Sequence, residues 1–234
     1  MFMKSLFLPV LMVISLFSCR TDATDDPIVN ELETPTWKYL ALGDSYTIGE
    51  SVPEAERWPV VLTDRLRAAG GQMEDAEIIA TTGWTTGNLI SAIEFQAPAE
   101  EYDLVSLLIG VNNQFQGRSL EEYRTEFTEL LQTSIRLAKG NASRVFVVSI
   151  PDYGYTPFGQ NNQEAISAEI DIFNAACQEI TESFGIKYFN ITPISREAFD
   201  GPGYVAPDGL HPSGYQYSLW VDLMYEEVKE MLLP

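Results

Sequence analysis

The sequence predicts an α/β fold in which a five-stranded parallel sheet is covered by helices on both faces. Short apolar, β-branched segments alternate along the chain with longer amphipathic segments. Such alternation is typical of parallel strands that are connected through helices, which bury the sheet on both sides. With 234 residues, of which 45% are hydrophobic, the chain is long enough for one well-buried domain and too short for two comfortable ones.

The predicted strands are the apolar runs at residues 37–42, 77–81, 104–109, 145–150 and 186–191. Segments with a helical period lie between and after them, at residues 58–69, 120–139, 163–184 and 213–233. The helix predicted at 120–139 begins after Ser119, with Glu122 three residues on, which is the spacing of a capping box, and it stops at Gly140.

Residues 1–18 have the pattern of an export signal. Lys4 supplies a positive charge, and residues 6–17 form an apolar run that is shorter than the roughly 20 residues of a membrane-spanning helix. The run ends in Leu-Phe-Ser-Cys, which resembles a bacterial lipobox, so we expect Cys19 to become the lipidated first residue of the mature protein. An ordinary secretory signal, or a short anchor with an incidental cysteine, is the alternative.

Residues 19–36 are predicted to be a disordered tether between the lipid and a domain that covers residues 37–234. The tether is polar and acidic and contains two prolines, so it has too little apolar surface to fold. The whole chain carries a net charge of −20, which argues against nucleic acid or an anionic membrane surface as a partner. The lipid is therefore the one membrane contact that we expect.

Cys177 is the one cysteine of the predicted domain, so no disulfide framework supports the fold. It shares a helical spacing with Ile170, Phe173 and Ile180, which indicates a buried core thiol rather than a nucleophile. The chain has a single histidine and no Cys/His cluster, so we expect neither a zinc site nor an organic cofactor.

Ser45 follows the first predicted strand, at the edge where parallel sheets bind their ligands. In the segment Gly-Asp-Ser-Tyr-Thr-Ile-Gly at residues 43–49, a strand-to-helix turn can present the hydroxyl above the sheet, next to backbone N–H groups. This is not the G-x-S-x-G elbow of the α/β-hydrolases, because Gly49 is four residues after Ser45 rather than two. Taken alone, the segment could equally be a helix cap.

His211 is the only histidine, and a serine nucleophile near neutral pH usually needs a histidine base. Asp208 lies three residues upstream, so that one loop can aim its carboxylate at the imidazole. Read separately, a lone histidine in a loop is a surface or capping residue, and Asp-Gly is an ordinary turn.

Two further strand ends offer donors for an oxyanion. Gly83, after the second predicted strand, lets the backbone approach a ligand closely. Asn112, after the third, offers a side-chain amide. Each also has a structural reading, Gly83 as a turn residue and Asn112 as a helix cap.

Taken together, Ser45, Gly83, Asn112 and His211 match in order the four sequence blocks of the SGNH hydrolases, also called the GDSL esterase and lipase family. The chain resembles this family from about residue 39 to its C-terminus. The resemblance implies a flavodoxin-like three-layer sandwich. It further implies a triad of Ser45, His211 and Asp208, and an oxyanion hole made by the Ser45 and Gly83 amides and the Asn112 side chain.

Two positions depart from the family pattern. Tyr46 stands where the family name has Leu, and Asn113 replaces the Asp of the usual Gly-x-Asn-Asp block. Because a neutral amide replaces a carboxylate acceptor, we expect rearranged hydrogen bonds in the supporting loop, while Asn112 keeps its role.

Residues that face the substrate are predicted from the loops around these positions. The candidates for lining an acyl or alcohol pocket are Trp84, Gln114, Phe115 and Tyr204. Residues 151–159, which are rich in Tyr, Gly and Pro, are expected to form one rim. Aromatic residues in loops also pack without binding anything.

The sequence therefore predicts a serine esterase that hydrolyses small acyl or carbohydrate acetyl esters through an acyl-enzyme intermediate. No long apolar lid segment is apparent, which favours small esters. The alternatives are a lysophospholipase or thioesterase of the same family, and a non-catalytic, carbohydrate-binding surface lipoprotein. The export signal and lipobox place the expected enzyme in the bacterial cell envelope, anchored at the outer membrane or the cell surface.

Overall fold

The computed structural model describes residue 2 and residues 36–199, 201 and 203–232. The predicted signal peptide, apart from Phe2, lies outside the described residues, as do Cys19 and the tether up to residue 35. The residues from 34 to the C-terminus form one unit. Within the described part of the chain, no helix combines the length and the apolar character of a membrane span.

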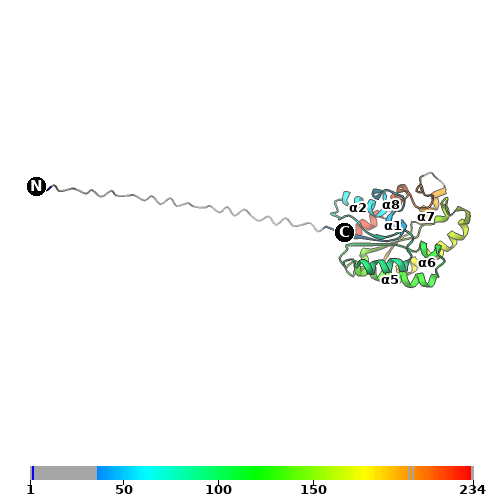
Figure 1. Cartoon of the computed structure of the whole chain (residues 1–234), viewed down its shortest axis with the longest axis horizontal. Helices are drawn as coiled ribbons and strands as arrows, with labels where there is room; N and C mark the ends of the chain where they lie inside the picture. The colour runs from blue at the N-terminus through cyan, green and yellow to red at the C-terminus, as the bar shows by residue number, and fades with distance from the viewer. Residues whose placement is uncertain (1, 3–35, 200, 202, 233–234) are drawn as a thin grey trace. The chain divides into compact units, whose positions relative to one another are not determined.

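A parallel sheet of five strands forms the centre of this unit (Figure 1). The strands are β1 (Tyr39–Gly43), β2 (Glu77–Ala80), β3 (Leu104–Leu108), β4 (Val145–Val148) and β5 (Lys187–Phe189). They lie in the order β2-β1-β3-β4-β5, which is the flavodoxin-like order. The predicted fold class is confirmed, although the strands are up to three residues shorter than the apolar runs that predicted them.

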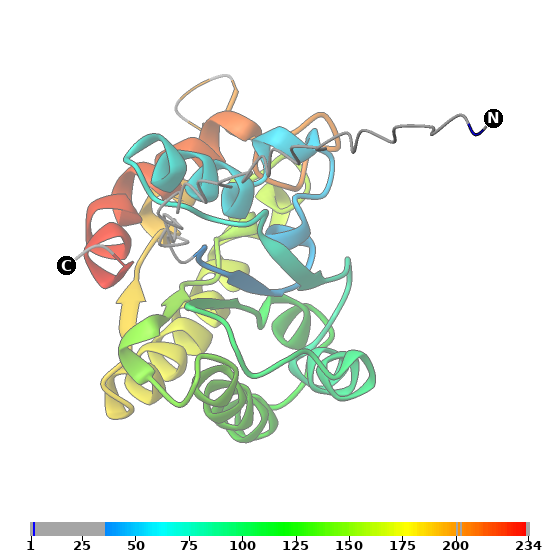
Figure 2. The same cartoon turned by 90° about the vertical axis from the view of Figure 1, so that its left-hand side faces the viewer.

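Helices cover both faces of the sheet, which makes the structure a three-layer sandwich. Figure 2 shows α2 and α8 on one face and α3, α5 and α6 on the other. The helices are α1 (Ser45–Ile48), α2 (Trp58–Ala68), α3 (Thr86–Gln96), α4 (Val111–Phe115), α5 (Leu120–Leu137), α6 (Gln163–Ser183), α7 (Thr192–Arg196) and α8 (Gly214–Leu232). Short 3₁₀ segments include η1 (Glu54–Glu56) and η3 (Tyr153–Tyr155).

The four predicted helices are present with ends shifted by at most two residues, whereas α3 was not predicted. α5 is capped as its sequence indicates, because the Ser119 hydroxyl accepts from the backbone N–H of Glu122 at 3.1 Å. α3 begins with a capping box that uses an amide instead of a carboxylate. The Thr85 hydroxyl accepts from the Asn88 backbone at 3.3 Å, and Asn88 Oδ1 accepts from the Thr85 backbone at 3.1 Å.

The register of the central strands brings their carboxyl ends level. Gly43 of β1 lies opposite Ala80 of β2 on one side and Leu108 of β3 on the other. The residues that follow these three strands therefore emerge side by side at one edge of the sheet. A Cβ atom on Gly43 would stand 2.5 Å from the carbonyl oxygen of Leu108, so the close strand packing at this edge requires glycine.

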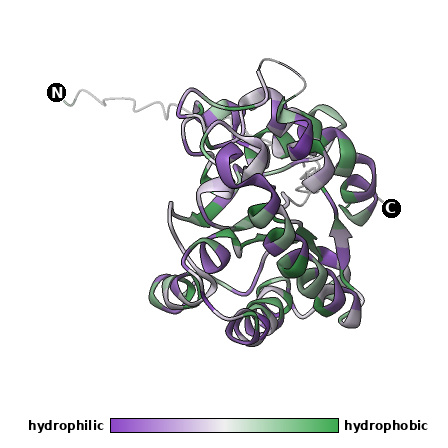
Figure 3. Ribbon diagram, turned by 90° about the vertical axis from the view of Figure 1, so that its right-hand side faces the viewer, coloured by the Kyte–Doolittle hydropathy of each residue, from purple (hydrophilic) through white to green (hydrophobic). Residues whose placement is uncertain are grey.

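The core lies between the sheet and the two helix layers. In Figure 3 the central strands are mostly hydrophobic, and the outward faces of the helices are largely hydrophilic. Trp58 of α2 and Trp220 of α8 are fully buried on one side of the sheet. On the other side, the ring centroid of Tyr123 on α5 lies 4.9 Å from that of Phe173 on α6. This packing fixes both helix layers against the sheet and holds the strand ends in place.

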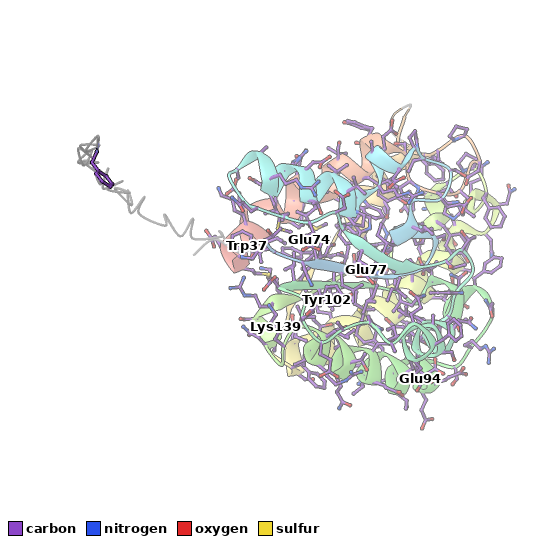
Figure 4. All side chains as sticks on the ribbon, turned by 60° about the vertical axis from the view of Figure 1, so that its left-hand side comes forward. Trp37, Glu74, Glu77, Glu94, Tyr102 and Lys139 are labelled. Carbon is purple, nitrogen blue, oxygen red and sulfur yellow. The ribbon has the colours of Figure 1, made fainter. Side chains whose placement is uncertain are left out.

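At the amino-terminal edge of the sheet, residues at or just before the starts of neighbouring strands contact one another (Figure 4). The Tyr102 hydroxyl, just before β3, donates to Glu77 Oε2 at the start of β2 at 2.6 Å. The backbone N–H of Glu74 donates to the Trp37 carbonyl at 2.9 Å, ahead of β1. The loops that carry the predicted site residues all lie at the opposite edge.

Candidate active site

A pocket of about 130 Å³ opens at the carboxyl ends of the strands. Its lining residues come from segments far apart in the sequence: Ser45, Tyr46, Thr82, Gly83, Val111, Asn112, Phe115, Tyr153, Phe158, Leu210 and His211. The structure thus brings together one residue from each of the four blocks. A larger hollow of about 420 Å³ lies over α3 and α5, but none of the predicted site residues lines it.

Ser45 is the first residue of α1 and is 5% exposed. Asp44 precedes it as the N-cap, and its Oδ1 atom accepts from the backbone N–H of Tyr46 at 3.0 Å. Gly49 ends this short helix in the left-handed conformation, with φ of 68°. The tight turn therefore holds Ser45 at the pocket wall directly after β1.

His211 is 8% exposed and lines the same pocket. Its Nδ1 atom lies 2.6 Å from Asp208 Oδ2, so Nδ1–H donates to the carboxylate and Nε2 is left for the pocket. The imidazole stands edge-on to the Tyr46 ring, with 5.7 Å between the ring centroids. Among the described residues no hydrogen bond joins Ser45 to His211, which is common for a nucleophile and its base before substrate binds.

The Asp208 carboxylate accepts four hydrogen bonds. The backbone N–H groups of Leu210 and His211 donate to Oδ1 at 2.9 and 3.0 Å, and Ser51 Oγ donates to Oδ2 at 2.6 Å, beside the imidazole. Partial burial would raise the pKa of Asp208, but the hydrogen bonds from Ser51, His211 and the backbone outweigh it and hold the pKa well below its usual range. The carboxylate is therefore charged at neutral pH.

Gly83 and Asn112 lie beside each other in the pocket wall. Gly83 has φ of 85°, and a Cβ atom at this position would meet nothing within 4 Å, so the backbone there faces open space. Asn112 Nδ2 donates to the Trp84 carbonyl at 3.0 Å. An amide nitrogen has two N–H bonds, so one is held by Trp84 and one remains for a ligand.

Asn113 holds the loops behind these donors and is fully buried. Its Oδ1 atom accepts from the backbone N–H of Thr86 at 3.0 Å, and its Nδ2 atom donates to the Thr86 hydroxyl at 2.6 Å. The second bond requires an amide, because an ionised carboxylate can only accept. The supporting hydrogen bonds thus use the Asn that replaces the Asp of the family pattern.

Among the residues predicted to face the substrate, Phe115 lines the pocket. It forms an aromatic cluster with Tyr153 and Phe158, with centroid separations of 6.1 to 6.3 Å. Phe115 and Phe158 are 58% and 55% exposed, which is high for large apolar side chains. Tyr153 and Phe158 belong to the segment 151–159 that was expected to form a rim.

Gln114 lines a neighbouring hollow of about 470 Å³ instead of the pocket. Its amide donates to Glu169 Oε2 at 2.6 Å and accepts from the Tyr153 hydroxyl at 3.0 Å. This hollow shares Phe115, Tyr153 and Phe158 with the pocket, so the two spaces adjoin along the aromatic cluster.

The structure does not bring Trp84 or Tyr204 to the pocket wall. Trp84 is partly buried against the hydrophobic core and contacts Asn112 through its backbone carbonyl. Tyr204 packs edge-on against Tyr215, with 5.3 Å between ring centroids, and donates its hydroxyl to Glu197 at 3.0 Å. Both side chains are engaged in packing, which sequence proximity to Gly83 and Asp208 does not reveal.

Ser51 and Tyr46 are the site residues that sequence reasoning missed. In the sequence Tyr46 is only a variation of the motif, yet in the structure it both lines the pocket and contacts the imidazole. Ser51 gives no local signal, because its partner Asp208 lies 157 residues further along the chain.

Cys177 lies in the core and lines no part of the pocket. It is 1% exposed, and burial raises the pKa of its thiol to about 12, so it is the buried core thiol that the helical spacing predicts. Among the described residues, no group of three or more His, Cys, Asp or Glu side chains is arranged to hold a metal ion.

Comparison with known proteins identifies a family to which the sequence matches, and comparison with solved structures identifies proteins of the same fold. The model of the GDSL-like Lipase/Acylhydrolase family matches residues 41–219. An arylesterase from Vibrio mimicus is 30% identical over 181 residues, which cover 75% of this chain and 80% of that protein.

Solved structures with the same fold share fewer residues. TesA superimposes with a TM-score of 0.66 at 15% identity, covering 83% of this chain and 99% of that chain. The acetylxylan esterase Axe2 from Geobacillus stearothermophilus gives 0.65 at 20% identity, covering 82% and 94%. The psychrotrophic esterase EstA from Pseudoalteromonas sp., in a structure inhibited by monoethylphosphonate, gives 0.61 at 20% identity, covering 84% and 99%.

Proposed function

This chain belongs to the GDSL-like lipase/acylhydrolase family, the SGNH hydrolases, and is a carboxylic ester hydrolase; we propose that Ser45 is its nucleophile and His211 its base. The observation that carries this assignment is the pocket itself. It is lined by Ser45, Gly83, Asn112 and His211, and His211 is bonded through Nδ1 to Asp208. These are the groups that acyl transfer to a serine requires.

The reaction proceeds in two halves. His211 Nε2 takes the proton from Ser45 Oγ, which attacks the ester carbonyl, and the negative charge moves to the carbonyl oxygen. The Ser45 and Gly83 N–H groups and the Asn112 amide stabilise this oxyanion. Collapse breaks the ester bond, and the alcohol leaves with the proton from His211. Water then attacks the acyl-enzyme in the same way and releases the acid and free Ser45.

The size of the pocket favours a small acyl group. Its volume of about 130 Å³ is small beside the adjoining hollow of about 470 Å³, which favours an acyl chain of a few carbon atoms. Acetyl to butyryl esters fit this space better than long-chain lipids. The related Vibrio mimicus protein carries the name arylesterase, which is consistent with ester hydrolysis.

The adjoining hollow favours a neutral, hydroxyl-rich alcohol such as a carbohydrate. Its lining includes the aromatic residues Phe115 and Phe158 and the exposed polar residues Asn161, Asn162 and Glu169. Exposed aromatic faces pack against the C–H faces of sugars, and amide and carboxylate groups hydrogen-bond to hydroxyls. The net charge of −20 disfavours the polyanionic alcohols or thiols of a thioesterase. The fold neighbour Axe2 is an acetylxylan esterase.

Chain-length profiling separates this proposal from a lysophospholipase or thioesterase. The purified protein is assayed with p-nitrophenyl acetate, butyrate, octanoate and palmitate, and with an acyl-coenzyme A thioester. We expect kcat/KM to be highest for acetate or butyrate. A maximum at octanoate or longer, or a preference for the thioester, would replace the small-ester proposal.

Fluorophosphonate labelling separates the enzyme from a non-catalytic binding lipoprotein, an alternative that the family and its relatives do not support. The wild-type chain should be modified on Ser45, and Ser45→Ala should not be labelled. Ser91→Ala, which removes an exposed hydroxyl on α3, is the matched control and should be labelled like the wild type. A wild-type chain that takes up no label would contradict the assignment.

We also propose that the enzyme is exported and anchored through lipid on Cys19, because of the apolar run at residues 6–17 and the lipobox-like end of that run. Growth of the host with labelled palmitate tests this. The wild-type chain should carry the label and fractionate with membranes, and Cys19→Ala should do neither. An unlabelled wild-type chain would exclude the anchor and leave the esterase assignment untouched.

A further inference from the structure

We propose that Ser51 is a positioning residue of the esterase, which acts by holding the Asp208 carboxylate in place for His211. Ser51 Oγ donates a hydrogen bond to Asp208 Oδ2 at 2.6 Å, the same oxygen that accepts from His211 Nδ1. This inference rests on the proposed roles of Ser45, His211 and Asp208.

The other hydrogen bonds of Asp208 come from within its own loop. Its remaining donors are the backbone N–H groups of Leu210 and His211 and the His211 imidazole, all within three residues of Asp208. Among the described residues, Ser51 is the hydrogen-bond donor to Asp208 from outside this loop. It therefore ties the loop that carries the base to the segment that follows the nucleophile, across 157 residues of sequence.

The backbone conformation of Ser51 is unfavourable for a serine. Its φ is 66°, in the left-handed region that favours glycine and disfavours residues with a Cβ atom. Gly49, two residues earlier, takes the same conformation with glycine. A glycine at position 51 would relieve the backbone, so a serine there needs another reason.

Packing does not account for a serine at position 51. Ser51 is exposed, and its hydroxyl bonds to the Asp208 carboxylate. A hydrogen bond to a charged group is among the stronger ones in proteins, and here it also contributes to the lowered pKa of Asp208. The side chain thus serves the carboxylate rather than the core.

The expected effect on catalysis has two parts. Without Ser51 the carboxylate is restrained only by its own loop, so the imidazole is less well oriented and kcat falls. The carboxylate also keeps more negative charge toward the imidazole, which favours the protonated base, so the acid limb of the pH–rate profile moves to higher pH. Tyr46 stands against the imidazole, and Asp44, Glu50, Arg57 and Asp208 all act on the buried Tyr217. The substitutions below replace none of these ionisable residues.

The experiment compares Ser51→Gly, Ser51→Ala and Ser51→Thr in the full chain, with p-nitrophenyl acetate from pH 5 to 9. Ser51→Gly removes the hydroxyl but suits the left-handed backbone, so relief of backbone strain offsets the lost hydrogen bond and its Tm should stay close to that of the wild type. Its kcat should nevertheless fall about tenfold, with KM within about twofold and the acid limb raised. Ser51→Ala should show the same kcat and the same acid limb, because it lacks the same hydroxyl.

Ser51→Thr provides the rescue. It restores the hydroxyl on a β-branched residue that the left-handed region disfavours, so its Tm should fall while kcat stays within about threefold of the wild type at a temperature below unfolding. If the glycine variant has a low kcat and a Tm close to that of the wild type, and the threonine variant a high kcat and a lower Tm, then the loss of kcat does not come from a loss of fold stability. If the threonine variant does not fold, the glycine and alanine variants decide.

A Ser51→Gly variant with the kcat and acid limb of the wild type would overturn the inference. His211→Ala is measured in the same assay. If the wild type has no activity above His211→Ala, the proposed function fails, and if the wild type is active but Ser51→Gly equals it, only the role of Ser51 fails.

Discussion

The buried side chain of Asn113 is bonded twice to Thr86, once to its backbone N–H at 3.0 Å and once to its hydroxyl at 2.6 Å. This pair joins α4, the short helix after β3, to the first residue of α3, and so it holds the segments that carry Asn112 and Gly83 together. The Thr86 hydroxyl donates its own proton to Glu126 of α5. The chain of donors therefore runs from Asn113 through Thr86 to the Glu126 carboxylate.

Asn113→Asp, which restores the residue of the family pattern, should destabilise this protein. The introduced carboxylate could no longer donate to Thr86, and it would compete with the Glu126 carboxylate for the one hydroxyl proton of Thr86. We expect Tm to fall by about 5 to 10 °C at pH 8, for a loss of about 2–3 kcal/mol, and by less at pH 5, where a carboxylate is more readily protonated. Thermal unfolding at the two pH values measures this.

Glu126→Gln is the compensating change. In the double variant Asn113→Asp with Glu126→Gln, the glutamine amide donates to the Thr86 hydroxyl, and that hydroxyl donates to the carboxylate introduced at position 113. We expect the double variant to regain most of the lost Tm, with a coupling energy of about 1–2 kcal/mol in the double-mutant cycle. Additive losses in the two single variants would contradict the shared proton chain.

Asp44 should make the folded state less stable as the pH rises, which is the opposite of the effect of a carboxylate whose pKa is lowered by folding. Its full burial next to Ser45 raises its pKa to about 7, despite backbone hydrogen bonds that lower it. The folded state thus keeps a proton that the unfolded state releases from its ordinary pKa of 3.8 upward. This stabilisation is complete below about pH 4 and is lost as pH rises toward 7.

Asp44→Asn tests this, because the amide cannot ionise and its oxygen still accepts from the Tyr46 N–H. We expect the Tm of the variant, relative to that of the wild type, to increase from pH 5 to pH 8. Scanning calorimetry at constant ionic strength measures this difference. A difference in Tm that stays constant over this range would show that Asp44 does not titrate there.

Asn112→Ala should lower kcat more than it changes KM. The free N–H of the amide is proposed to bond to the oxyanion of the tetrahedral intermediate rather than to the ground-state ester. Loss of one such donor reduces kcat by about 100- to 1000-fold. Steady-state kinetics with p-nitrophenyl acetate measure this, and a variant that changes KM alone would assign Asn112 to substrate binding instead.

Phe158→Ala should discriminate between alcohols. With acetylated xylo-oligosaccharides we expect kcat/KM to fall about tenfold or more, because the sugar loses an aromatic face, while p-nitrophenyl acetate changes by less than about threefold. Phe95→Ala on α3 is the control, since Phe95 is 90% exposed and does not line either space. Equal losses on both substrates would argue against a carbohydrate in the hollow.

The fold could be predicted from the sequence because its signals are local. Strand and helix periods mark β1 to β5 and the four long helices, whereas the capping box of α3 was missed because Asn88 stands where Glu or Gln is usual. Pairs across long separations, such as Ser51 with Asp208, leave no local pattern. Proximity in sequence also misled, since Trp84 adjoins Gly83 yet packs against the core.

In the proposed mechanism Ser45 is the nucleophile and His211 is the base that takes its proton. Hydrolysis of p-nitrophenyl acetate by wild type and His211→Ala, at equal concentration and below both melting temperatures, tests it most directly. We predict that kcat of His211→Ala falls by about 10⁴-fold or more, as loss of a triad member does in serine hydrolases. A variant that keeps the wild-type kcat would contradict the mechanism.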